Sequence, residues 1–453
     1  LQIHRSPSGP MMVALRSLLF ALPLAVAMAA NGADLMEIYR MAQSADAQYA
    51  AARATWSAGQ EKLPQGLAGL LPSATVSAST QQNDRETRSR DPAVPTIDSR
   101  FNSNIASISI TQPLYRPQNV AVYDQARSQV LQSDAVFAQA TQDLILRVAQ
   151  AYFDVLLAQD TVVFAQAQLT AIGRQLEQAK RNFEVGTATI TDTHEAQSRY
   201  DLTVSLEIVA KNELEVRKRL LELIIGRPAP GISPLGPRFS PRFPEPDNPA
   251  VWVGDAAYNN LGVRISQANL DFATKEIERN RAAHRPTLDA FATYTDAGSG
   301  TGTTSIAGVD TKTGVVGVQL AIPIYQGGLT SSRVREAIAN EEKARQDLEN
   351  ARRTAELTAQ QTYLGVASGI SQVKALEAAL VSSQSSLDST RLGQEVGVRT
   401  QIDVLNAQQQ LSQTRRDLAQ AKYNYILSLL RLKASAGQLT EQDVALVNGW
   451  LDR

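Results

Sequence analysis

The segments FEVGTATITD (183–192) and QEVGVRTQID (394–403) are two versions of one pattern, in which a Val-Gly pair is followed by a polar run that ends in aspartate. Other segments recur at the same spacing of about 210 residues, which indicates an internal repeat. These are QPLY (112–115) with IPIY (322–325), and QAYFDV (150–155) with QTYLGV (361–366). We therefore expect two structural repeats, at 33–226 and 250–437, each running helix, strand, loop, strand, long helix, turn, helix.

The segment 227–249 separates the two repeats. It contains eight of the chain's 19 prolines, and proline removes a backbone donor and clashes within a helix. The sequence therefore predicts a non-helical linker there, and a C-terminal segment at 438–453 after the second repeat.

The predicted helices are too long for an ordinary globular core. From 119 to 183 there is no proline, and apolar and small residues recur at helical spacing, so a single helix of ~65 residues would span ~100 Å. Such helices must pack side by side as coiled coils, which also leaves open a periplasmic coiled coil without a lumen. The other predicted helices are 34–63, 192–225, 250–283, 327–393 and 402–436.

The predicted strands distinguish a channel from a simple coiled coil. In NIASISITQ (104–112) and GVVGVQLAI (314–322), apolar residues recur at every second position. A strand of about ten residues with this alternation is typical of a transmembrane β-barrel, where one face meets lipid and the other meets water. The partner strands are predicted at 74–82 and 287–295, with polar loops at 83–100 and 296–312. Four strands cannot close a barrel, so several chains must share one.

Composition and the N-terminus agree with export. Residues 1–32 are expected to be a signal peptide with some upstream residues, because the apolar run SLLFALPLAVAMAA (17–30) follows Arg16 and precedes small residues. Cleavage is expected after Ala29 or near Ala30, so that the mature chain begins near Ala33. No other apolar stretch is expected to form a transmembrane helix.

The charge and the reactive residues argue against several function classes. The net charge of -1 gives no electrostatic basis for binding nucleic acid, and the chain has no cysteine. Its three histidines are too scattered for a metal cluster, and it has no glycine-rich phosphate loop of the P-loop or dinucleotide type. We expect no metal, no cofactor and no enzymatic activity.

The chain resembles the TolC family of outer-membrane export channels. The resemblance is carried by SSQSSLDSTRLGQEVGVRTQIDVLNAQQQL (382–411), AKYNYILSLLRLKASAGQLTEQDV (421–444), IPIYQGG (322–328) and AYFDVLLAQD (151–160). It implies a mainly α fold with a transmembrane β-barrel, and a homotrimer in which twelve strands form one barrel in the outer membrane and twelve helices form a tube across the periplasm. The missing cysteine separates this chain from the lipid-anchored drug-efflux branch of the family.

The resemblance also implies a function and partners. The trimer would be the passive outer-membrane conduit of a tripartite system, docked to a periplasmic adaptor and to an inner-membrane ABC transporter or proton-driven pump. Type I secretion of a protein such as an RTX-type toxin is the favoured cargo assignment, and efflux of small molecules is the alternative. The sequence does not name the cargo.

The two Val-Gly turns are the candidate site. Gly186 and Gly397 supply a backbone conformation that a residue with a Cβ resists, so each marks the reversal of a long helix into a short one. The resemblance places a periplasmic gate just after these turns. It implies that Thr191 and Asp192 bond across protomers to Arg399, and that Asp403 faces the pore.

A simpler role for the aspartates remains open at this stage, because Asp192 and Asp403 could merely cap the helices that follow. Two positions depart from the family pattern. Gln394 stands where the family has a gate tyrosine, and Asn406 stands where it has a second pore aspartate. Glutamine can still form hydrogen bonds, but asparagine removes the charge.

Overall fold

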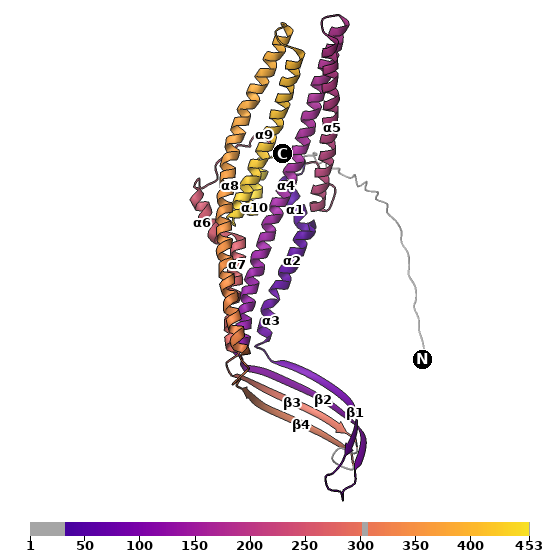
Figure 1. Cartoon of the computed structure of the whole chain (residues 1–453), viewed down its shortest axis with the longest axis vertical. Helices are drawn as coiled ribbons and strands as arrows, with labels where there is room; N and C mark the ends of the chain where they lie inside the picture. The colour runs from indigo at the N-terminus through magenta and orange to yellow at the C-terminus, as the bar shows by residue number, and fades with distance from the viewer. Residues whose placement is uncertain (1–31, 301–306, 453) are drawn as a thin grey trace, which may run out of the picture.

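The computed structural model describes residues 32–300 and 307–452. The protomer is elongated, with a sheet at one end and two long helical hairpins at the other (Figure 1). The strands are β1 (Ser73–Thr87), β2 (Ile97–Tyr115), β3 (Thr287–Ser299) and β4 (Val309–Ala321). The helices are α1 (Leu35–Ala45), α2 (Ala47–Gln60), α3 (Lys62–Ala68), α4 (Pro117–Glu184), α5 (Ile190–Ile225), α6 (Pro249–Asn259), α7 (Leu261–Ala282), α8 (Leu329–Glu395), α9 (Gln401–Ser435) and α10 (Glu441–Asn448). Residues 1–31 of the predicted signal segment 1–32 lie outside the described residues, as do 301–306 and 453.

The two longest helices set the length of the molecule. Helices α4 and α8 contain 68 and 67 residues. At 1.5 Å per residue each spans roughly 100 Å. Helix α4 begins with Pro117 in its first turn, where the missing N–H costs no hydrogen bond. Each helix ends at a Val-Gly turn, and a shorter helix, α5 or α9, returns along it (Figure 1).

The predicted helices 34–63 and 250–283 are wrong as single helices. The first is divided at Asp46, which ends α1 and caps α2 by accepting a hydrogen bond from the Tyr49 amide at 2.6 Å, and again at Glu61, between α2 and α3. The second is divided at Asn260, whose side chain accepts from the Gly262 amide at 2.9 Å. Short polar side chains of this kind bond to nearby backbone and so favour helix ends over helix interiors.

The four strands form one antiparallel sheet in the order β1-β2-β3-β4. The register places Ala74, Ile110, Ala292 and Val316 in one row across the sheet. The next row, on the opposite face, carries hydroxyl side chains on β1, β2 and β3 and Val315 on β4. There Ser109 and Thr293 share a hydrogen bond of 3.2 Å, and two rows further, on the same face, Ser77 and Ser107 share one of 2.8 Å. The sheet therefore has one apolar face and one hydroxyl-lined face, as a strand between lipid and water requires.

The strands extend further than the predicted ranges 74–82, 104–112, 287–295 and 314–322, and parts of the predicted loops 83–100 and 296–312 are strand. The β1–β2 ladder continues through polar residues, and Arg100 forms an ion pair of 3.0 Å with Asp84 across it. Only about ten residues are needed to cross a membrane as a tilted strand, so the remaining length of β1 and β2 projects as a polar hairpin.

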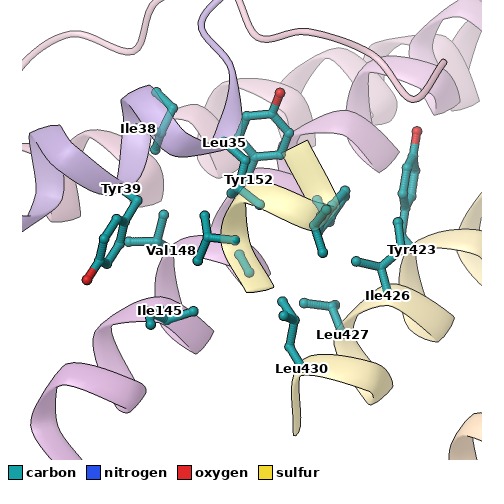
Figure 2. Close-up of a cluster of buried hydrophobic side chains, with 14 of the residues drawn as sticks. Leu35, Ile38, Tyr39, Ile145, Val148, Tyr152, Tyr423, Ile426, Leu427 and Leu430 are labelled. Carbon is teal, nitrogen blue, oxygen red and sulfur yellow. The ribbon is translucent and has the colours of Figure 1, made fainter. Parts of the chain in front are cut away.

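The core of the protomer lies where α1, α4 and α9 meet, between the sheet and the hairpin tips. Figure 2 shows Tyr39 and Ile38 of α1 facing Val148 and Tyr152 of α4, with Ile426 of α9 on the other side of the same cluster. These side chains are almost completely buried. Their burial joins the first and second repeats into one body.

The proline-rich segment 227–249 is non-helical up to Asn248 and packs against this core. Ile232 is buried and pairs with Ala33 in a short β-bridge, and Leu235 pairs with Leu451. The Tyr425 hydroxyl donates to the Arg242 carbonyl at 2.7 Å. The segment is therefore a packed strap over the helices and not a loose connector.

The prediction that no other apolar stretch could form a transmembrane helix is wrong as far as length and composition go. Among the described residues, α4 and α8 each contain such a window. Both helices are more than three times longer than the ~20 residues that cross a bilayer, and both pack along neighbouring helices. Within the protomer, 22% of the α4 window and 17% of the α8 window is buried, so composition and length alone do not make either helix a membrane span.

Candidate gate at the helical tip

Each hairpin reverses direction through a glycine in the left-handed region. Gly186 has a φ of 78° and Gly397 a φ of 80°. The next amide reaches back to the end of the long helix, from Thr187 to the Asn182 carbonyl and from Val398 to the Gly393 carbonyl, both at 2.8 Å. This pattern is the glycine-terminated helix end that the repeated Val-Gly pairs predict.

We expect Gly186→Ala and Gly397→Ala to destabilise each tip by about 1–2 kcal/mol, because a Cβ resists the left-handed conformation. Nothing lies within 4 Å of the position of that Cβ, so the effect would come from the backbone alone. Hydrogen exchange of the tip amides measures it. Gly365→Ala inside α8 is the control, since it also meets no neighbour but has ordinary helical geometry. Equal exchange at the tip in all three variants would contradict this account.

The helices that follow the turns begin with matching capping boxes. The Asp192 amide donates to Thr189 Oγ1 at 3.2 Å, while Asp192 Oδ2 accepts from the Thr189 amide at 2.9 Å. Thr400 and Asp403 repeat the arrangement at 3.3 and 2.9 Å. The backbone and hydroxyl donors of Thr400, with a smaller contribution from the charge of Arg399, hold the pKa of Asp403 below its usual range. Helix capping by both aspartates is thus realised in the structure.

The two capping carboxylates each keep one oxygen that is not used in the cap. The cap uses Oδ2 of each aspartate, and no hydrogen bond to Oδ1 of Asp192 or Asp403 occurs within the described residues. Arg399 packs over Gly393, and its charge acts on Asp403 without forming a close ion pair among the described residues. Thr191 is exposed. Asp192 therefore keeps Oδ1 available for a further bond, although Oδ2 is used in the cap.

The two departures from the family pattern have partners within the protomer. The Gln394 amide donates to the side chain of Gln401 across the second turn. Asn406 accepts from Arg199 of α5 at 3.3 Å. The structure thus brings Gln394, Arg399 and Asp403 together at the second tip and leaves Thr191 and Asp192 at the first. That Arg399 bonds to Thr191 and Asp192 of a neighbouring protomer remains a prediction.

The sequence reasoning missed Arg199. It lies two helical turns after Asp192, so its spacing alone places it on the same face of α5. Its partners are on α9, about 200 residues away in the chain, and no local pattern indicates them.

The described residues, 32–300 and 307–452, contain no group of three or more side chains placed to hold a metal ion.

Known proteins share both the sequence and the fold. The family model described as outer membrane efflux protein matches residues 38–227 and 252–438. The chain is 33% identical to outer membrane protein TolC of Vibrio cholerae, over 92% of this chain and 94% of that one. It is 32% identical to the alkaline protease secretion protein AprF of Pseudomonas aeruginosa, over 91% of this chain and 86% of that one. The crystal structure of the Campylobacter jejuni CmeC outer membrane channel matches with a TM-score of 0.75 at 16% identity, over 99% of this chain and 98% of that one.

Proposed function

Because this chain belongs to the outer membrane efflux protein family, we propose that it is the exit duct of a tripartite export system and serves type I protein secretion. The resemblance found in the sequence is confirmed, and so is the mainly helical fold with an antiparallel sheet. The protein is an outer membrane channel whose helices extend into the periplasm. The cargo, the partners and the trimer are parts of the proposal.

The open sheet is the observation that supports a shared barrel. Strands β1 and β4 are the two ends of the sheet, and each pairs on one side only within the protomer. The unpaired amides of such an edge would be very unfavourable in lipid, where no water can satisfy them. Three copies joined edge to edge would form a closed twelve-stranded barrel, and their hairpins would continue it as a tube.

We expect the mature protein to be a trimer in mild detergent. Multi-angle light scattering with a correction for bound detergent measures its mass, and circular dichroism checks that strand and helix are retained. A folded monomer would contradict the shared barrel. A folded trimer without ion conductance in planar bilayers would instead favour the lumenless coiled coil.

Type I secretion is favoured over efflux by the relatives. AprF is named for secretion of alkaline protease, and it aligns with 91% of this chain at 32% identity. The family description refers to efflux, which keeps small-molecule export as the alternative.

The partners would be a periplasmic adaptor and an inner-membrane ABC transporter. The chain has no nucleotide-binding loop, so the proposal assigns it no enzymatic role and takes the energy from the transporter. The test is to express the chain in a host without such a duct, together with a protease transporter and its adaptor, or with a proton-driven pump and its adaptor. Protease in the medium supports secretion. Drug resistance without protease would support efflux.

A further inference from the structure

We infer that Arg116 keeps the lumen wall of the barrel free of net charge, so that the barrel favours neither cations nor anions. The inference rests on the proposed channel, in which the apolar face of the sheet meets lipid and the hydroxyl-lined face lines the lumen. Arg116 lies between β2 and α4, where the sheet joins the helices. It donates to both carboxylate oxygens of Asp289 on β3, from Nε to Oδ1 at 2.7 Å and from Nη2 to Oδ2 at 2.5 Å.

Asp289 lies on the hydroxyl-lined face of the sheet. Side chains alternate between the two faces of a strand, so Asp289 shares a face with Thr293, four residues further along β3. From the row of Asp289 to the row of Gln81, no other described residue on this face carries a charge. Two of the rows between them consist of Thr75, Ser109, Thr293 and Val315, and of Ser77, Ser107, Thr295 and Thr313.

The internal repeat avoids charge at the matching positions. Asp289 is the third residue of β3, and the third residue of β1 is Thr75. Arg116 follows the QPLY segment of the first repeat, and Gln326 follows the IPIY segment of the second. Thr75 and Gln326 are both uncharged. The acid and the base are therefore present together in one place, and both are missing from its counterpart.

The pair cancels a charge that ions in the lumen would otherwise meet. The Asp289 side chain is 13% exposed, and the Arg116 side chain is 41% exposed. Opposite charges in contact largely cancel at longer distances, and the two-pronged geometry of the guanidinium fixes the carboxylate in place. Channels select ions through rings of charged side chains. In a trimer, three unpaired Asp289 carboxylates would form such a ring, and so would three unpaired Arg116 guanidinium groups.

The test is the reversal potential of the full trimer in planar bilayers under a potassium chloride gradient, at about pH 8 so that carboxylates are ionised. Arg116→Gln should raise the permeability of potassium relative to chloride by roughly twofold or more near 0.01 M salt, where the Debye length is about 30 Å. Asp289→Asn should shift the ratio toward chloride, and the double variant should restore the unmodified ratio. At about 1 M salt the differences should vanish, because the Debye length falls to about 3 Å.

Two further variants serve as controls. Arg100→Gln also removes the arginine of a cross-strand pair, with Asp84 at 3.0 Å, but this pair lies on the other face of the sheet in the polar hairpin. It should leave the permeability ratio unchanged. Thr293→Asp adds an unpaired carboxylate to the hydroxyl-lined face and should shift the ratio toward potassium. Light scattering checks that each variant forms a trimer.

Asp289→Asn decides the inference even if Arg116→Gln fails to form a trimer, because the guanidinium that it leaves behind is always charged. An unchanged ratio for Asp289→Asn, or a double variant that does not restore the unmodified ratio, would overturn the inference. Thr293→Asp without effect would overturn it too, since the hydroxyl-lined face would then not line the conducting lumen. In each case an unmodified trimer that conducts leaves the proposed channel standing. An unmodified trimer without conductance would contradict the proposed function and the inference together.

Discussion

Arg399→Ser is expected to raise single-channel conductance strongly, because it would remove the predicted bond to Thr191 and Asp192 of a neighbouring protomer. Within its own protomer Arg399 has no ion-pair partner among the described residues, and Asp192 keeps Oδ1 available after capping. Each charge-assisted bond would stabilise the closed channel by on the order of 1.5–3 kcal/mol. A trimer contains one such set of bonds per subunit. Loss of Arg399 should therefore shift the equilibrium strongly from the closed to the open channel.

Planar-bilayer recording at low and high salt measures the effect. High salt should narrow the difference between Arg399→Ser and the unmodified channel, since exposed charges are screened. Arg391→Ser is the matched control, because Arg391 donates to Gln408 of the same hairpin at 3.1 Å and should act locally. An unchanged conductance for Arg399→Ser would mean that the tip residues serve only as caps and turns.

Asp46→Ala is expected to cost the most stability of the changes considered. The Asp46 carboxylate pairs with Arg147 through bonds of 2.9 and 3.0 Å and is 5% exposed. It also caps α2. Removing one partner of a fully buried pair typically costs about 3–5 kcal/mol. The Arg147 side chain is 32% exposed, so water can partly solvate the charge left behind and we expect a loss below that range. Thermal unfolding of the purified trimer should show a lower midpoint.

Two variants separate the roles of Asp46. Asp46→Asn keeps an oxygen for the cap and loses the charge, so its loss should be smaller than that of Asp46→Ala. Asp154→Ala removes a more exposed pair, in which Arg217 lies at 3.4 Å, and should cost only ~0–1 kcal/mol. If Asp46→Ala unfolds at the same temperature as Asp154→Ala, the pair is not a main support of the core.

The same pair predicts a dependence on pH. The side-chain bond from Arg147 lowers the pKa of Asp46 in the folded protein. The unfolded protein therefore binds this proton more readily, and the stabilisation is fully present above the ordinary aspartate pKa of about 3.9. It is lost as the pH falls through the lower folded value. Acid unfolding should thus begin at a higher pH in a protein with a weakened pair, and Asp46→Asn should remove this part of the profile.

Part of the candidate site could be read from local sequence. The Val-Gly pairs predict the turns because a left-handed residue favours glycine, and the Thr-x-x-Asp spacing is that of a capping box. The link from Arg199 to Asn406 could not be read in this way. It joins two hairpins whose relative position depends on packing elsewhere in the protomer.

The sequence by itself determined the repeated plan of long helices and alternating strands, because periodicity, glycine and proline act over a few residues. Asp46 and Asn260 are residue types that favour helix ends, so the sequence also contained an indication of these two breaks. The helical periodicity on both sides of each residue nevertheless predicted a single helix. Only the tertiary structure decided that β2 pairs with β3 and that the proline-rich strap covers the core. It alone placed the hairpins of the two repeats side by side. These arrangements depend on burying apolar surface between segments far apart in the chain, which a local pattern cannot specify.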